Sequence, residues 1–132
     1  MFYSFDITIP ANTLQASPQK TILKLCYGII HKVDIVFPSG CSGLVGISVN
    51  NATHQVWPTN RGQHFCSDGE TISWREFLEN TTEPFELNAL AWNTDQTYEH
   101  RLTVRVGVLP LSVVAPWLLA YIDRLNAALG IE

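Results

Sequence analysis

The stretch VDIVFPSGCSGLVGISVNNATHQVW, residues Val33 to Trp57, decides the fold of this chain. Proline and glycine end strands, and asparagine tolerates the positive φ that two-residue hairpin turns require. The stretch therefore predicts antiparallel strands joined by tight turns. We expect a strand, a Pro/Gly-rich corner, a second strand, a tight Asn50-Asn51 turn and a return strand, at residues 33–37, 38–43, 44–49, 50–51 and 53–57.

The flanking sequence repeats this alternation of apolar and polar residues, which is the signature of half-buried strands. With a short strand at Gln63–Cys66, about eight strands are predicted, and the acidic segment Arg75–Pro84 is predicted to be a surface loop. No helical pattern separates the strands, so the fold class expected for residues 1–110 is all-β, an antiparallel β-sandwich or jelly-roll-like domain. The further alternating segments are Tyr3–Ile9, Thr21–Tyr27, Ile29–Phe37, Glu70–Trp74, Phe85–Trp92 and Tyr98–Leu109. The expected core includes Ile35, Phe37, Leu87, Val104 and Val106.

The spacing of the apolar residues changes in residues 111–132. This segment is predicted to form a linker (Leu111–Ala115) and one C-terminal amphipathic helix that begins at Pro116. Apolar side chains recur there at spacings of four, three and four residues, and two aromatic residues widen the stripe. We expect this stripe to bind another chain; the alternative is that it packs against its own sheet. The candidate interface residues are Trp117, Leu118, Tyr121, Ile122, Leu125 and Leu129.

Composition excludes several classes of function. The 132 residues carry a net charge of −4, and their Lys and Arg residues are scattered, so no basic stripe predicts nucleic acid as a partner. No apolar run approaches the roughly 20 residues that span a bilayer, and the N-terminus does not resemble a signal peptide. The expectation is a protein without a membrane partner that is made and assembled in the cytoplasm. Its charged content of 15% is low against about 25% in typical soluble domains, so the chain either buries more of its surface than usual or contacts partners.

Neither a metal site nor a catalytic centre is predicted. The three cysteines, Cys26, Cys41 and Cys66, have no CxxC spacing and are expected to be buried free thiols in a reducing compartment; one intramolecular disulfide is the alternative. A zinc site could be drawn from His54, His64 and Cys66, but no fourth ligand has a recognisable spacing. Cys41 lies in a Pro-Ser-Gly-Cys-Ser-Gly corner that lacks the pattern of a nucleophile turn. The predictions are therefore no metal, no cofactor and no enzymatic activity.

Three tryptophans leave an alternative open. Trp57, Trp74 and Trp92 could form a sugar-stacking platform of the kind that carbohydrate-binding modules use, or they could simply fill the core or an interface.

Several phrases of the sequence together resemble a family. They cover roughly residues 5 to 110 and match a set of small virion-associated β-domain proteins of tailed phages and prophages. The resemblance implies a virion component, such as a head-decoration protein or a small tail or baseplate subunit, and it carries over no active-site residues. The phrases are DITIPANT (Asp6–Thr13), FPSGCSGLVGISV (Phe37–Val49), HQVWPTN (His54–Asn60), AWN (Ala91–Asn93) and VRVGVLP (Val104–Pro110).

The sequence thus favours a non-enzymatic structural protein of a virus particle, a self-associating decoration or minor capsid or tail subunit. Its expected partners are itself, as a homo-oligomer for which a trimer would suit a decoration role, and other virion proteins. Its expected location is the virion, after assembly in the host cytoplasm. The alternative is a carbohydrate- or receptor-binding β-module.

Overall fold

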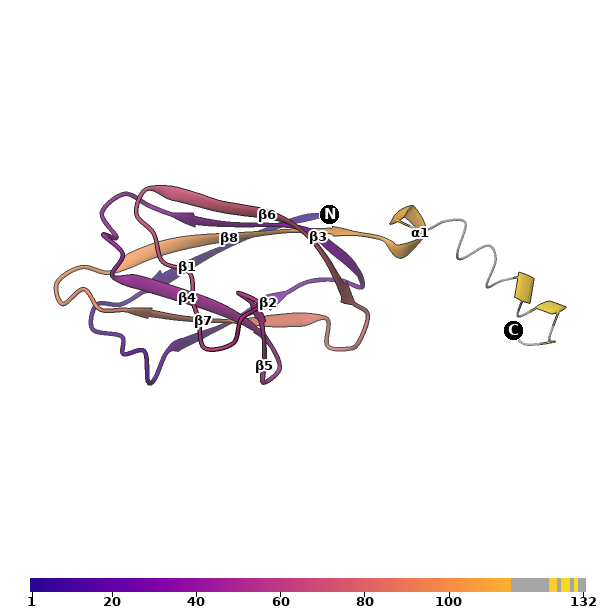
Figure 1. Ribbon diagram of the computed structural model, residues 1–132, viewed down its shortest axis with the longest axis horizontal. Helices are drawn as coiled ribbons and strands as arrows, with labels where there is room; N and C mark the ends of the chain where they lie inside the picture. The colour runs from indigo at the N-terminus through magenta and orange to yellow at the C-terminus, as the bar shows by residue number, and fades with distance from the viewer. Residues whose placement is uncertain (115–123, 126, 129, 131–132) are drawn as a thin grey trace.

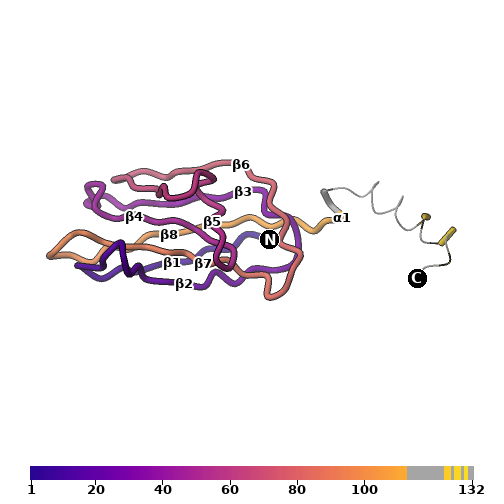
Figure 2. The backbone as a smooth tube through the Cα atoms, turned by 60° about the horizontal axis from the view of Figure 1, so that its bottom comes forward, coloured from indigo at the N-terminus to yellow at the C-terminus, as the bar shows by residue number. Residues whose placement is uncertain are grey.

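The protein folds into two four-stranded antiparallel sheets that lie face to face (Figures 1 and 2). The computed structural model describes residues 1–114, 124–125, 127–128 and 130. One sheet has the strand order β1-β8-β3-β6 and the other β2-β7-β4-β5. The predicted all-β class with antiparallel sheets is confirmed. The elements are β1 (Phe2–Ile9), β2 (Gln19–Lys24), β3 (Gly28–Phe37), β4 (Val45–Asn51), β5 (His54–Trp57), β6 (Glu70–Asn80), β7 (Glu86–Asn93), β8 (His100–Leu109) and α1 (Leu111–Val114).

The strand pairing is nested. β1 pairs with β8, β2 with β7, β3 with β6 and β4 with β5. The first strand thus pairs with the last, the second with the second-to-last, and so on to the middle of the chain. Two further pairings, β3 with β8 and β4 with β7, complete the two sheets. Each sheet ends in strands paired on one side only, and β6 and β5 are such edge strands.

A single apolar core lies between the sheets. It forms because alternate residues of each strand point to the same face. Leu102, Val104, Val106 and Val108 of β8 are all fully buried, as their alternation predicts. The five core residues predicted from the sequence are at most 1% exposed, and all belong to this core: Ile35, Phe37, Leu87, Val104 and Val106.

The β4–β5 turn lies two residues beyond the predicted position. Asn50 and Asn51 remain in β4, where they pair with Gln55 and His54. The turn is formed by Ala52 and Thr53, and Ala52 takes the positive φ of 53°. The prediction of an Asn50-Asn51 turn was wrong because both asparagines are paired strand residues. The register shift between Val49 and Asn50 leaves Val56 as an extra residue in β5, and the two-residue turn then falls at Ala52 and Thr53.

The segment Arg75–Pro84, predicted to be a loop, is strand through Asn80. β6 runs unbroken from Glu70 to Asn80. The alternation was hidden because Glu76, a charged residue, occupies an inward-facing position, whereas Phe77 faces outward and is 63% exposed. A tertiary contact of Glu76, described below, makes that inward position favourable.

The C-terminal prediction is tested only in part. α1 occupies Leu111–Val114, where a linker was expected. Most of the predicted helix, with candidate interface residues Trp117, Leu118, Tyr121, Ile122 and Leu129, lies outside the described residues. Leu125 is described and is 47% exposed.

Two buried asparagines tie the ends of the strands together. The Asn93 side chain is fully buried; its Nδ2 donates to the carbonyl oxygens of Ile9 and Tyr98 at 3.2 and 2.9 Å, and its Oδ1 accepts from the backbone N–H of Asp95 at 3.0 Å. Asn80 makes the equivalent link elsewhere, donating to the carbonyl of Cys26 at 2.8 Å. Buried amides of this kind are stabilising because they satisfy backbone groups that water cannot reach.

We predict that Asn93→Ala lowers the free energy of unfolding by about 2 kcal/mol, since it leaves buried backbone groups without partners. Urea denaturation measures the change. The control Asn60→Ala, at an exposed loop position, is expected to stay within about 0.5 kcal/mol of the wild type. Equal effects of the two substitutions would contradict the role assigned to Asn93.

Candidate functional site

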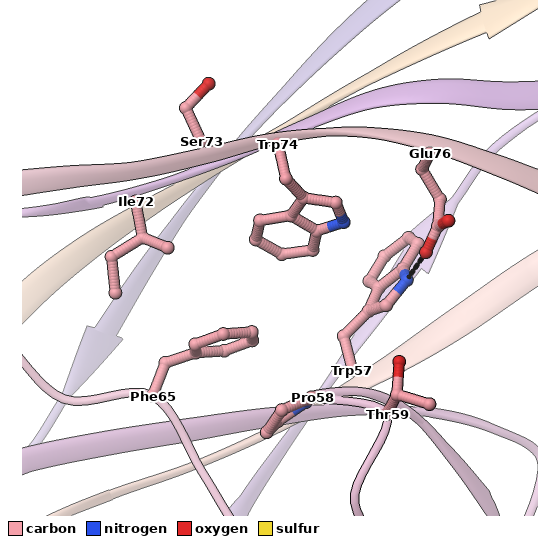
Figure 3. Close-up of a pocket in the computed structure, with 8 residues that line it drawn as sticks. All are labelled: Trp57, Pro58, Thr59, Phe65, Ile72, Ser73, Trp74 and Glu76. Atoms are coloured by element: carbon pink, nitrogen blue, oxygen red, sulfur yellow. Dashed lines mark hydrogen bonds between the residues drawn. The ribbon is translucent and has the colours of Figure 1, made fainter.

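A cleft of about 410 Å³ opens at the side of the molecule where β5 and β6 form the edges of the two sheets. Its size falls within the range of about 300–1,000 Å³ typical of small-ligand pockets. Figure 3 shows Trp74 and Ile72 pointing from β6 toward Phe65, with Pro58 and Thr59 on the opposite rim. The lining residues are Trp57, Pro58, Thr59, Phe65, Ile72, Ser73, Trp74 and Glu76.

Period-two alternation places the β6 side chains of this cleft. Ile72, Trp74 and Glu76 point inward between the sheets, whereas the Ser73 side chain points away (Figure 3). The Ser73 hydroxyl instead donates to Asp34 on the outer face. The strand therefore presents two apolar side chains and one carboxylate to the cleft, and its unpaired edge borders the cleft.

Phe65 is carried into the cleft by a backbone link to the opposite sheet. Its N–H donates to the Ile47 carbonyl at 2.9 Å, and its carbonyl accepts from the Ile47 N–H at 3.0 Å. The Phe65 ring stacks on Trp74, with centroids 5.2 Å apart and an interplanar angle of 28°. Both rings are half-buried, so part of each aromatic surface remains open to solvent.

Trp57 has a different role from the one considered in the sugar-stacking alternative. It is only 2% exposed and packs edge-on against Trp74, with centroids 5.6 Å apart. Its indole Nε1 donates to the Glu76 carboxylate, the dashed line in Figure 3. The second oxygen of Glu76 accepts from the Phe77 N–H at 3.0 Å. Trp57 thus fixes the position of Glu76, while its own ring is unavailable for stacking.

Side-chain hydrogen bonds hold the rim loop. Gln55 Nε2 donates to the carbonyl oxygens of Pro58, Asn60 and Gln63 at 2.8, 3.3 and 3.2 Å. Arg61 also lies 2.6 Å from His54 Nδ1. These contacts order the loop between β5 and Phe65, so the rim of the cleft is largely preformed.

Trp92, the third tryptophan considered from the sequence, lies elsewhere. It is 7% exposed and covers Gly46, where an added Cβ would lie 2.4 Å from the indole ring. His64 packs edge-on against the same ring at 4.8 Å. The structure therefore brings together Trp57 and Trp74 and separates Trp92 from them.

The residues considered for a zinc site are also placed. His54 contacts Arg61, and His64 contacts Trp92. All three cysteines are free, but the prediction that they are buried holds only for Cys41 and was wrong for Cys66, which is exposed. Within the described part of the chain, no group of three or more His, Cys, Asp or Glu side chains is arranged to hold a metal ion. Nor does any helix among those residues have the length and apolarity to cross a bilayer.

Cys41, the residue considered as a nucleophile, is fully buried in the β3–β4 corner. Burial, followed by the nearby charge of Asp68, raises the pKa of its thiol. Asp68 closes this corner by accepting the Gly40 N–H at 2.8 Å, and backbone N–H groups of Ser42 and Gly40 lower the pKa of that carboxyl. A high thiol pKa opposes thiolate formation, so the corner is built for structure rather than nucleophilic attack.

Sequence reasoning missed Phe65 and Glu76. Phe65 lies in a segment with weak strand character, and only its pairing with Ile47 reveals its position. Glu76 was assigned to a solvated acidic loop. Its polar character in an otherwise alternating run was the one available signal, because an inward charge needs a partner.

No family model matches the chain, and no curated protein matches it. Among solved structures, the chain is similar to the crystal structure of PirA, with a TM-score of 0.46 and 14% sequence identity over 80% of this chain and 94% of that chain. A similarity at this level says nothing about what the present chain binds or does.

We predict that thiol reagents label the three free cysteines in the order of their exposure. Cys66 is exposed, Cys26 is half-buried and Cys41 is buried, and thiol reactivity follows thiolate fraction and access. Peptide mass spectrometry after brief labelling of the native protein should find Cys66 modified and Cys41 unmodified, with Cys41 reacting only in denaturant. Rapid native labelling of Cys41, tested also in Cys66→Ser, would refute this.

Proposed function

We propose that this chain is a non-enzymatic jelly-roll domain that binds a glycan in the cleft between β5 and β6. The observation that carries the proposal is the half-exposed pair Trp74 and Phe65, which faces a preformed hollow with a carboxylate at one side. Aromatic faces with a few polar groups are the usual composition of a small-ligand site.

The nested strand pairing supports the jelly-roll assignment. Pairing of β1 with β8, β2 with β7, β3 with β6 and β4 with β5 is what a long hairpin gives when it is wrapped into two sheets. Jelly rolls of eight strands occur in both viral capsid and lectin domains. The fold therefore favours neither of the two functions predicted from sequence over the other, and the cleft has to discriminate.

The chemistry of the cleft suits a sugar ring. A pyranose has an apolar C–H face that can lie against an indole or phenyl ring, and hydroxyls that need polar partners. Thr59 on the rim and Glu76 beside Trp57 supply such partners. Because Gln55 already orders the rim loop, little conformational entropy has to be lost when a ligand binds.

The same lining argues for binding rather than hydrolysis. Glycosidases act with two carboxyl groups about 5–10 Å apart. Among the described residues that line the cleft, Glu76 is the one carboxylate, so the pair that hydrolysis needs is not formed there; each of its oxygens accepts one bond, from Trp57 or the Phe77 N–H, and keeps a lone pair for a hydroxyl. This supports a lectin-like role.

We expect a glycan that enters the cleft to change tryptophan fluorescence and to lose affinity when the cleft is altered. A glycan array followed by calorimetry identifies the ligand. Trp74→Ala should weaken binding by about tenfold, which corresponds to about 1.4 kcal/mol and is the order of magnitude that one stacked aromatic side chain contributes to the binding of a nucleic-acid base.

Since Trp74 also packs against the core, a second variant leaves the core untouched. Thr59→Arg places a long side chain at the exposed rim and should block entry, whereas Thr53→Arg, in the equally exposed β4–β5 turn, should bind normally. Absence of binding across the array, or normal binding by a folded Thr59→Arg protein, would overturn the proposal.

A role in a virus particle is the second proposal, and it is compatible with the first. It rests on the family resemblance of residues 5 to 110, and the jelly-roll strand order is compatible with it. Under it, the domain is a decoration or minor capsid or tail subunit that self-associates through the C-terminal stripe. The exposed Leu125 belongs to that stripe.

We predict that Leu125→Glu lowers the mass of the full-length protein in light scattering from an oligomer to a monomer, because it places a charge in an apolar interface. Ala127→Glu is the matched control: Ala127 is also exposed and falls on the opposite side of a helical stripe that contains Leu118 and Leu125. A monomeric wild type, or an unchanged mass for Leu125→Glu, would contradict self-association through this stripe.

A further inference from the structure

A second hollow lies next to the aromatic cleft. It has a volume of about 560 Å³ and is lined by His31, Lys32, Arg75 and Glu76. Glu76 lines both hollows. β6 is an edge strand, and its neighbours Trp74 and Arg75 point to opposite sides of it. A ligand that rests on Trp74 can therefore reach Arg75 around the free edge of one strand.

A β-bulge builds this hollow. The register of β3 shifts between Ile30 and Lys32 against both β6 and β8, so His31 is an extra residue in the strand. Bulges re-aim side chains and occur frequently beside functional sites. Here the bulge places His31 beside Lys32, where a regular strand would alternate them between the two faces.

Gly107 of β8 makes room for the imidazole. A Cβ at this position would lie 2.7 Å from His31 Nε2, closer than real contacts allow. Gly107 pairs with Lys32 across the sheet. The glycine and the bulge therefore act together to seat His31 on the outer face, next to two cationic side chains.

The hollow is positive even though the chain carries a net charge of −4. Lys32 lies 3.8 Å from Asp34, whose carboxylate also accepts the Ser73 hydroxyl. Among the described residues, no carboxylate lies within 4 Å of the Arg75 guanidinium; Glu76 is part of the lining, but its carboxylate is bonded to Trp57. The sheet as a whole is not basic, because its four Lys and Arg residues are matched by five Asp and Glu residues; the positive charge is local to the hollow, where Lys32 and Arg75 face one carboxylate residue, Glu76.

We propose that the ligand of the cleft is an acidic glycan, whose sugar ring stacks on Trp74 and whose carboxylate or sulfate group binds at His31, Lys32 and Arg75. This inference rests on the proposed glycan-binding function. Guanidinium groups bind planar and tetrahedral oxyanions through paired N–H donors, and a neighbouring ammonium adds charge at the same point. The anionic group decides which sugar is preferred, while the aromatic cleft provides stacking that any pyranose could use.

The first test compares a neutral oligosaccharide with its sulfated and its carboxylated counterparts, all at one ionic strength because salt screens charge. The wild-type protein should bind the acidic forms about tenfold more tightly, as one charge-assisted contact of about 1.4 kcal/mol implies. Arg75→Gln and Lys32→Gln should remove this preference and leave the affinity for the neutral sugar unchanged. Arg101→Gln, on the same sheet but outside the lining, should keep the preference.

The second test examines the anion site without a sugar. Inorganic sulfate should shift the His31 ring signals in NMR spectra of the wild-type protein, and Arg75→Gln should abolish the shift. A wild-type protein that binds neutral and acidic sugars equally, a preference that survives in Arg75→Gln, or a His31 ring insensitive to sulfate overturns the inference. If neutral sugars bind and depend on Trp74 while any of these results is found, the acidic subsite fails and the glycan-binding function stands.

If no sugar of any charge binds, the proposed function fails and the acidic-glycan ligand fails with it. The sulfate response of His31 then reports only whether the hollow holds an anion. The two proposals are therefore separated by different readouts: dependence on Trp74 for the first, and dependence on Arg75 for the second.

Discussion

The inward-facing row Val33, Ile35 and Phe37 of β3 is the constraint on which the rest of the structure depends. β3 is an inner strand, paired with β8 on one side and β6 on the other, and this row is at most 1% exposed. Once it faces the second sheet, period-two alternation fixes the outward direction of Lys32 and Asp34. The register of β6 against β3 then sets which of its residues enter the cleft and which face the basic hollow.

Much of the fold could be predicted from sequence, because burial on one face of a strand leaves a repeating pattern in the chain. The alternation of Leu102, Val104, Val106 and Val108 gave β8 its correct face. Local sequence patterns gave the wrong structure where contacts between strands decided the conformation. Asn50 and Asn51 pair with Gln55 and His54, so the turn falls at Ala52-Thr53, and Val56 is an extra residue in β5. Neither residue type nor spacing along the chain encodes this pairing.

The candidate site was harder to predict because it, too, depends on contacts between segments that are far apart in the sequence. Trp57 and Trp74 were recognised as a possible platform, but their distance depends on how two sheets pack, not on any spacing along the chain. Phe65 reaches the cleft through a two-bond link with Ile47 of the other sheet. Glu76 was placed in a loop because its inward position is favourable only when the Trp57 indole lies within hydrogen-bonding reach. Sites formed across an open side of two sheets thus draw on residues with no common sequence signal.

An edge strand gives this molecule a way to combine two kinds of contact. Successive side chains of a strand point to opposite faces of the sheet. An inner strand has a hydrogen-bonded neighbour on each side, so one ligand cannot reach from one face to the other. β6 has a neighbour on one side only, and the step from Trp74 to Arg75 passes from an aromatic surface to a cationic one across its width. Charged side chains on such an edge also oppose unwanted pairing with a second sheet. Arg75 can therefore discourage strand addition and still present its guanidinium to an anion, so protection of the edge and recognition of a ligand need not compete.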